Sequence, residues 1–337
     1  MKQWIGALCI ALAGSAAAAK APATPTALFS SDQPLRVAIQ GPMATLASNR
    51  TTPALPATMT VDGVGYAITL APRGITRLTK DVCDFPPLRV QLTSPAPPGS
   101  LFHGQHRLKL VTHCKRDPGF QQKVLLEYAA YRLYNLMTPL SFRARLATID
   151  YVDQAGRPYV SRVGFFIEDF SDVAKRNGMS DAHKGSRVPL EQIDPSAGAR
   201  MSVFEYMISN YDWSMRAAPQ GEECCHNGRL LAGAPGSLLT PVPYDFDFSG
   251  LIDAPYADVP EGLPVTNVRQ RTYRGYCAHL PQARGFAAQL AQRRPEFLSV
   301  FATIPGLEPR EQSRAATFLQ GFFADLDSGK IFKACLN

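Results

Sequence analysis

Beyond its N-terminal stretch, the sequence has no apolar run long enough to cross a membrane, because charges, prolines and glycines interrupt every candidate. It has no dominant block of lysines and arginines, which argues against a nucleic-acid partner. Neither a G-x-S-x-G nor an H-E-x-x-H motif occurs, so no standard signature of a hydrolase is present. These absences leave a globular protein whose chemistry must be sought in less common patterns.

The composition is that of an ordinary globular chain able to build a core, with 45% hydrophobic and 19% charged residues. A length of 337 residues suits one large domain or two lobes that share a cleft. The net charge of +7 favours anionic partners such as phosphates, acidic glycans or membrane surfaces. The alternative is that most of these charges form an ordinary solvated surface.

The first residues have the order of a cleavable export signal. Lys2 is followed by an apolar stretch over residues 4–13, and then by a small-residue run that ends at Ala19. Charge, apolar core and small-residue cleavage site are the features of a secretory signal peptide. We therefore expect a signal peptide over residues 1–19, a flexible leader over residues 20–34, and a periplasmic or secreted protein with no transmembrane segment after cleavage.

The cysteines agree with export. Apart from Cys9 in the signal region, an even number remains: Cys83, Cys114, Cys224, Cys225, Cys277 and Cys335. In an oxidising compartment these predict disulfides, although six cysteines allow 15 pairings. We favour Cys83–Cys114, because both flank strand-like segments that could be neighbours in one sheet.

The adjacent cysteines Cys224 and Cys225 pose a separate question. A bond between neighbours would be strained, so we expect each to reach elsewhere, with Cys277 and Cys335 as partners. A zinc site is the competing interpretation, since His226 follows the pair, but the ligand spacing elsewhere does not suit zinc.

Period-two alternation of apolar residues dominates the first half. It predicts strands over residues 35–39, 66–70, 88–92, 108–111, 146–151 and 159–166, with a helix over residues 121–137. The later sequence favours helices over residues 171–176, 199–209, 285–293 and 309–327. We expect an α+β protein with a β-rich first lobe over residues 35–168 and a helix-rich second lobe over residues 169–337.

Ionisable residues occur where packing alone would not require them: Lys109 in an apolar strand, Glu127 on the next helix, Asp212 after an apolar helix, and Asp245 and Asp247 between aromatics. Each has an ordinary alternative as an outward strand residue, an exposed helix residue, a helix cap or a loop carboxylate. Together, in this order, they match the needs of phosphoryl transfer. A lysine paired to a helix glutamate can hold phosphates, one aspartate can accept a hydroxyl proton, and an asparagine with a further aspartate can hold Mg²⁺.

The stretch from residue 101 to residue 256 resembles the spore-coat-protein-H-type (CotH) atypical kinases, which are similar to the HipA-type kinases. The motifs that carry the resemblance are Arg73-Gly74, Arg107-Leu108-Lys109-Leu110, Glu127-Tyr128, Phe166-Ile167-Glu168, Asn210-Tyr211-Asp212-Trp213-Ser214, His226-Asn227 and Tyr244-Asp245-Phe246-Asp247. The resemblance implies a two-lobed atypical protein-kinase-like fold, with one helix in the β-rich lobe and the catalytic and metal loops in the other.

The same resemblance assigns roles to residues. It implies that Asp212 is the catalytic residue and that Asn227 and Asp245, with Asp247 adjacent, bind the metal. It implies nucleotide binding by Lys109 and Glu127, with Glu168 at the hinge between the lobes. The cofactors would be ATP with Mg²⁺ or Mn²⁺, and the partners a nucleotide and a protein or glycan acceptor.

This sequence departs from the family pattern in three places, one of which is that no activation segment can be recognised. Asp212 and Asn227 are fifteen residues apart rather than a few, and no G-x-G-x-x-G loop is present, so residues 62–65 or 72–74 would have to cover the phosphates. These departures favour the alternative of a catalytically inactive, disulfide-braced envelope binding module. A hydrolase that uses Asp245 and Asp247 as an acid–base pair is a third possibility, but two such residues on one strand face are too close to flank a sugar bond.

Overall fold

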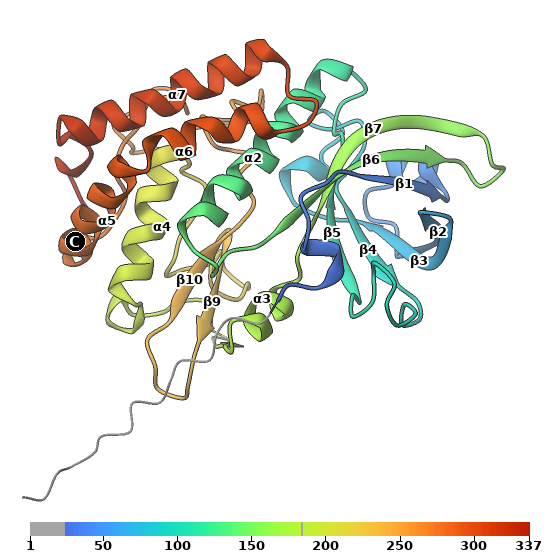
Figure 1. Cartoon of the computed structure of the whole chain (residues 1–337), viewed down its shortest axis with the longest axis horizontal. Coiled ribbons are helices and arrows are strands. Elements are labelled where there is room, and N and C mark those ends of the chain that lie inside the picture. The colour runs from blue at the N-terminus through green and yellow to red at the C-terminus, as the bar shows by residue number, and fades with distance from the viewer. Residues whose placement is uncertain (1–23, 183–184) are drawn as a thin grey trace, which may run out of the picture.

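The protein is described here by a computed structural model that covers residues 24–182 and 185–337 (Figure 1). The expected signal peptide at residues 1–19 lies outside the described residues. Within the expected leader, the 3-10 turn Ala27–Phe29 buries the side chains of Leu28 and Phe29 in the core of the first half. None of the helices in the two described ranges combines the length and hydropathy that a membrane crossing requires.

The first half is a closed seven-stranded barrel. Its strands are β1 (Leu35–Gln40), β2 (Leu55–Val61), β3 (Val64–Pro72), β4 (Leu88–Leu92), β5 (Arg107–Val111), β6 (Ala144–Val152) and β7 (Pro158–Ile167). Around the barrel they follow the order β1-β2-β3-β4-β5-β7-β6. All neighbours are antiparallel except β1 and β6, whose parallel pairing closes the barrel.

Local sequence explains how these strands form and turn. In β1, Val37 and Ile39 are fully buried, while Ala38 between them is more exposed, as alternation on a pleated strand requires. Between β2 and β3, Asp62 and Gly63 both have positive φ, at 50° and 78°, which fits a two-residue hairpin turn. The alternating apolar side chains point inward and form the barrel core.

The expected fold class was wrong. The strands do not form the β-rich lobe of a two-lobed atypical protein-kinase-like fold, because β1 pairs with β6 and closes the sheet. The first half also contains a second helix, α1 (Met43–Ser48). Closure joins residue 35 to residue 147, and such a distant pairing leaves no trace in local periodicity.

Most of the remaining helices gather beside the barrel, and α2 (Gln121–Met137) lies between the two parts (Figure 1). Residues 124–131 of α2 are all buried, because one side faces barrel strands and the other faces the helices. The other helices are α3 (Phe170–Arg176), α4 (Pro195–Ile208), α5 (Leu280–Gln292), α6 (Arg294–Ser299) and α7 (Pro309–Asp327). A small antiparallel sheet of β8 (Ser180–Asp181), β9 (Gly228–Ala232) and β10 (Thr240–Pro243) contacts α4 through β10 and α3 through β8.

The structure pairs all six cysteines considered above. It joins Cys83 to Cys114, the pairing favoured from the sequence, and Cys277 to Cys335. The expectation that the adjacent cysteines reach other partners was wrong, because Cys224 and Cys225 are bonded to each other. Cys277 and Cys335 meet instead because the C-terminal segment runs beside residues 275–277, where the backbone N–H of Cys277 donates to the carbonyl of Leu336.

Candidate functional site

Two adjoining cavities lie where the barrel meets the second half. One, of about 650 Å³, is the cationic pocket, and its basic lining residues are Arg73, Arg89, Arg107, Lys109, Lys175 and Arg229. The other, of about 630 Å³, is the carboxylate pocket, and its acidic lining residues are Asp212, Glu222, Glu223, Asp245 and Asp247. Because Arg73, Arg229 and Tyr244 line both cavities, the two pockets form one cleft.

Asp212 is held on one wall of the carboxylate pocket. It follows α4, and its backbone N–H donates to Oδ1 of Asn210 at 3.1 Å. The side-chain amide of Asn227 donates to Oδ2 of Asp212 at 2.8 Å and to its carbonyl oxygen at 2.7 Å. The fourteen residues between them fold back on themselves, since the backbone N–H of Ser214 donates to the carbonyl of His226. The structure therefore brings Asp212 and Asn227 together despite their spacing.

His226 is the second partner of Asp212. Its Nε2 lies 2.5 Å from Oδ1 of Asp212, and this hydrogen bond raises the pKa of the imidazole. The ring therefore donates its Nε2–H to the carboxylate. The competing zinc interpretation fails because both sulfurs of Cys224 and Cys225 belong to a disulfide.

Asp245 and Asp247 come from the segment after β10, on either side of a buried aromatic. Phe246 is fully buried and packs against Tyr131 at 4.7 Å between ring centroids. The hydroxyl of Tyr131 accepts a hydrogen bond from the backbone N–H of Asp245, and Oδ2 of Asp247 accepts one from the hydroxyl of Tyr256. The core position of Phe246 directs both carboxylates toward the cleft.

A residue that sequence reasoning missed, Arg77, contacts three carboxylates at once. Its Nη1 lies 3.1 Å from Oε2 of Glu127, and its Nη2 lies 2.9 Å from Oδ1 of Asp245. Its Nε lies 3.2 Å from Oδ2 of Asp247. Burial raises the pKa of Asp247 to about 6. Burial also acts to raise the pKa of Asp245, but the surrounding positive charges, of which Arg77 contributes most, together outweigh burial and lower that pKa.

Lys109 projects from β5 into the cationic pocket and not toward Glu127. Its Nζ lies 3.8 Å from the centre of the Tyr244 ring. Burial, followed by the charge of Arg73, lowers the pKa of Lys109 to about 7. The structure thus separates the lysine and the glutamate that the sequence pattern had linked, and Arg77 takes the lysine's place beside Glu127.

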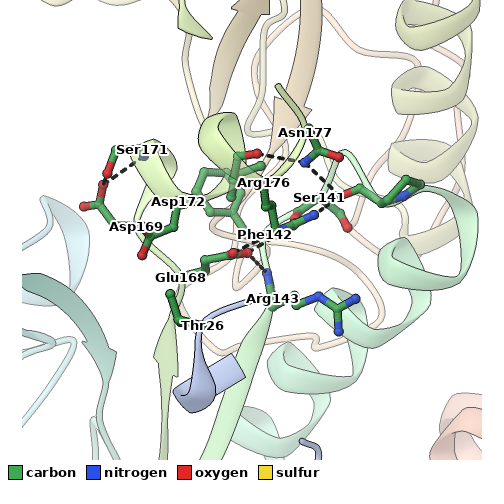
Figure 2. Close-up of polar contacts among 12 residues, drawn as sticks. Thr26, Ser141, Phe142, Arg143, Glu168, Asp169, Ser171, Asp172, Arg176 and Asn177 are labelled. Atoms are coloured by element: carbon green, nitrogen blue, oxygen red, sulfur yellow. Dashed lines mark hydrogen bonds and ion pairs between the residues drawn. The ribbon is translucent and has the colours of Figure 1, made fainter. Parts of the chain in front are cut away.

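Glu168 lies at the edge of the cationic pocket, but its carboxylate is turned inward (Figure 2). The side chain of Arg176 donates to Oε1 at 2.9 Å and to Oε2 at 3.1 Å, and the backbone N–H of Arg143 donates to Oε2 at 3.0 Å. Both carboxylate oxygens are thus engaged within the protein. This side chain fixes the end of β7 to α3 and to the segment before β6.

The carboxylates that could hold a metal are close together. Oxygen atoms of Glu127, Asp245 and Asp247 lie within 4.8 Å of one another, and oxygen ligands suit Mg²⁺ or Mn²⁺. However, the guanidinium of Arg77 already contacts all three side chains. As the side chains stand, the cluster does not fit a divalent ion.

One sequence signal could have revealed Arg77. It follows Arg73-Gly74 by three residues, in the loop that leaves β3 for the cleft. Gly74 has φ of 100°, a value that glycine adopts without strain, and it lets this loop turn toward the carboxylates. A second basic residue three positions after a glycine in a turn indicates that the loop places a positive charge in the site.

Comparison with known proteins gives little to add to this geometry. No family model matches the chain, and no curated protein matches it. Among solved structures, the crystal structure of the Helicobacter pylori proinflammatory kinase CtkA is a distant neighbour. The alignment covers 72% of this chain and 87% of the CtkA chain. The TM-score is 0.37 and the sequence identity 10%, and a likeness this distant carries no conclusion about activity.

Proposed function

We propose that the protein transfers a phosphoryl group from a nucleotide to a hydroxyl group of a protein or glycan. The observation that supports this most is the continuity of the cleft, in which a cation-lined pocket opens into one lined by carboxylates. Positive side chains can bind a polyphosphate at one end while a carboxylate receives the acceptor hydroxyl at the other. Phosphoryl transfer depends mainly on such positioning and electrostatic stabilisation.

In this proposal Asp212 is the general base. Asn227 and His226 donate hydrogen bonds to its two carboxylate oxygens and so fix the orientation of the side chain. A lone pair on either oxygen can take the proton of the acceptor hydroxyl as the acceptor oxygen bonds to the terminal phosphorus, while the bond from that phosphorus to the bridging oxygen breaks and the nucleoside diphosphate leaves. Lys109 and Arg73 would bind the phosphates from the opposite wall, where both side chains line the cationic pocket.

The nucleotide would be ATP with Mg²⁺ or Mn²⁺, as the family resemblance implies. We assign no step to the metal, because Arg77 contacts Asp245 and Asp247, two of its three predicted ligands. The third, Asn227, donates its amide protons to Asp212. The proposed roles therefore belong only to side chains of the protein.

The ion pairs of Arg77 favour a second candidate function, a catalytically inactive binding module. In that case the cationic pocket would hold a phosphorylated or otherwise anionic ligand, and the carboxylates would serve only to anchor Arg77. Because a ligand that binds only the folded state raises the melting temperature, ligand binding can be measured separately from turnover.

The test compares wild type with Asp212→Asn and with a matched control, Asp150→Asn, which alters a carboxylate on the barrel surface that pairs with Arg36. Labelled ATP with Mg²⁺ or Mn²⁺ should label the wild type or an added acceptor protein. Loss of the base should reduce the rate by roughly 10²–10⁴-fold, and the control should match wild type. Equal labelling by Asp212→Asn would exclude Asp212 as the base. A raised melting temperature with ATP but no transfer would favour the binding module.

We also propose that the protein works outside the cytoplasm, in the periplasm or in the surrounding medium. The three disulfides support this, because such bonds persist in oxidising compartments. Thiol labelling of protein isolated from its native cells should find these six cysteines oxidised. Six free thiols would contradict the proposed location.

A further inference from the structure

A third cavity, of about 390 Å³, lies on the barrel outside the cleft, and we call it the barrel pocket. Its walls come from the segment before β4, the segment after β5 and the strand β7. Its volume is within the range of small-molecule sites, roughly 300–1,000 Å³. None of the described residues that line it also lines the cationic pocket or the carboxylate pocket. The proposed phosphoryl transfer therefore makes no use of this cavity.

Two walls of the barrel pocket are fixed to each other. The disulfide between Cys83 and Cys114 joins the segment before β4 to the segment after β5. Beside it, the backbone N–H of Phe85 donates to the carbonyl of Cys114 at 2.9 Å. The backbone N–H of Arg116 donates to Oδ2 of Asp84 at 2.8 Å. The pocket is thus formed by covalent and hydrogen bonds within the protein, as small-molecule sites usually are before they bind.

Aromatic rings form one side of the pocket. The ring of Phe85 is stacked on the imidazole of His113, with 5.0 Å between centroids and 16° between planes. The ring of Tyr159 lies 6.1 Å from that of Phe85 and is exposed at the mouth. The face of an aromatic ring carries partial negative charge. It therefore attracts the C–H bonds of a sugar ring, whose carbons are electron-poor because each bears an oxygen.

Two side chains that line the pocket have buried nitrogen atoms without a partner. His113 is 2% exposed, and its Nδ1 has no hydrogen-bond partner among residues 24–182 and 185–337; the same is true of Nε of Arg162. Burial, followed by the charge of Arg162, lowers the pKa of His113 to about 4, so the imidazole is neutral at pH 7. A hydroxyl group suits a neutral ring nitrogen, because it can either donate or accept. A ligand that supplies the missing hydrogen bond removes an unfavourable feature of the empty site.

The charged lining of the pocket is mainly positive. Arg116 and Arg162 line it beside one carboxylate, that of Asp84. The guanidinium of Arg162 is oriented by hydrogen bonds of 2.9 Å to the carbonyls of Ser161 and Arg116. Guanidinium groups bind carboxylate and phosphate groups through charge-assisted hydrogen bonds. The lining therefore suits a ligand that carries hydroxyl groups and one anionic group.

We propose that the barrel pocket binds an acidic sugar, a monosaccharide unit that carries a carboxylate or a phosphate group. The aromatic side contacts the sugar ring, His113 and Asp84 form hydrogen bonds to its hydroxyl groups, and the two arginines bind its anionic group. A neutral sugar leaves the arginines without an anion, and an aromatic acid leaves Nδ1 of His113 without a hydroxyl. The inference goes beyond the proposed function, because it uses none of the residues assigned to phosphoryl transfer.

The test measures the binding of four probes to the purified protein by calorimetry and by saturation-transfer nuclear magnetic resonance. The probes are glucuronate and glucose 6-phosphate as acidic sugars, glucose as a neutral sugar, and benzoate as an aromatic acid. At least one acidic sugar should bind with a dissociation constant of about 1 mM or less. Glucose and benzoate should bind at least about tenfold more weakly, because each lacks one of the two kinds of polar contact.

Variants place the bound sugar in the pocket. Arg162→Met and Arg116→Met should each weaken the binding of the acidic sugar by at least about fivefold, because each removes a charged donor. His113→Phe keeps a stacked ring without its nitrogens and should weaken binding by roughly two- to tenfold. Arg294→Met is the matched control, because it removes the same charge from α6, where Arg294 pairs with Asp327 of α7, and it should leave binding unchanged.

Three results would overturn the acidic-sugar site. The first is no saturable binding of either acidic sugar by wild type up to about 20 mM. The second is binding that Arg116→Met and Arg162→Met leave equal to that of wild type. The third is glucose or benzoate bound as tightly as the acidic sugar.

Two variants keep the test decisive if His113→Phe or Arg162→Met does not fold, as judged by circular dichroism. Arg116→Met and Tyr159→Ser alter exposed side chains, and each should still weaken binding of the acidic sugar by at least about threefold. Equal binding by both and by wild type would exclude the barrel pocket. Because no nucleotide is present, a failure of phosphoryl transfer leaves all of these outcomes unchanged.

Discussion

Two buried arginines, Arg176 and Arg77, differ in how many carboxylates each one contacts. Arg176 meets one carboxylate, Glu168, and also donates to the carbonyls of Pro139 and Ser141 (Figure 2). Arg77 contacts three carboxylates, and Oε1 of Glu127 has no hydrogen-bond partner among residues 24–182 and 185–337. The first arrangement balances charge and hydrogen bonds, and the second has a surplus of acid.

The difference separates a structural ion pair from a candidate site. A buried ion pair with balanced charges, such as Arg176 with Glu168, requires no further ion or proton. Its role is to join two elements, here β7 and α3. A surplus of buried acid is unfavourable in a folded protein unless a cation or protons compensate it. Asp245 and Asp247 line the carboxylate pocket, whereas both oxygens of Glu168 are already taken within the protein.

The largest expected effect is on the balanced pair. Arg176→Met would leave the carboxylate of Glu168 buried without its cation and two backbone carbonyls without their donors. We expect a loss of about 3–5 kcal/mol in the free energy of unfolding, measured by urea denaturation. A loss below about 1 kcal/mol would show that Glu168 escapes the penalty by taking up a proton, and the two arginines would then no longer differ.

A smaller, pH-dependent effect is expected at the surplus site. Burial already raises the pKa of Asp247 to about 6, against about 3.9 for a free aspartate, and loss of Arg77 would raise it further. A folded state that binds more protons than the unfolded state loses stability as pH rises through that interval. Arg77→Met should therefore lose about 1–3 kcal/mol at pH 8 and clearly less at pH 5. Urea denaturation at pH 5 and at pH 8 measures this difference. An equal loss of unfolding free energy at the two pH values would contradict a surplus of buried acid at Arg77.

Local patterns predicted the pieces of this fold better than their assembly. The predicted strands over residues 88–92 and 108–111 and the helix over residues 121–137 coincide with β4, β5 and α2. The strand β2 was missed because its burial alternation is weak toward Leu55 and Pro56 interrupts its start. Closure of the barrel was missed because β1 and β6 are paired across more than half of the barrel sequence.

The candidate site shows the same division. Sequence order led to Asp212, Asp245 and Asp247, which do line one pocket. It could not show that Arg77, rather than Lys109, contacts Glu127. Tertiary packing decides which of these two basic side chains, from different segments of the barrel, reaches α2. The sequence can predict that a buried helix carboxylate has a positively charged partner, but it cannot predict which residue that partner is.

The smallest expected effect gives the sharpest comparison of the two sites. Glu127→Gln replaces a carboxyl group whose pKa burial raises to about 8, in a cluster that retains Asp245 and Asp247 as partners for Arg77. The free energy of unfolding should therefore change by less than about 1 kcal/mol. Glu168→Gln removes the one carboxylate that is bonded to Arg176 in the part of the chain that the structure describes, and it should cost more than about 2 kcal/mol. The two amides have the same size, so the difference isolates the charge. Equal losses measured in parallel urea titrations at pH 8 would mean that the surplus acid at Arg77 is needed for stability as much as the balanced pair is.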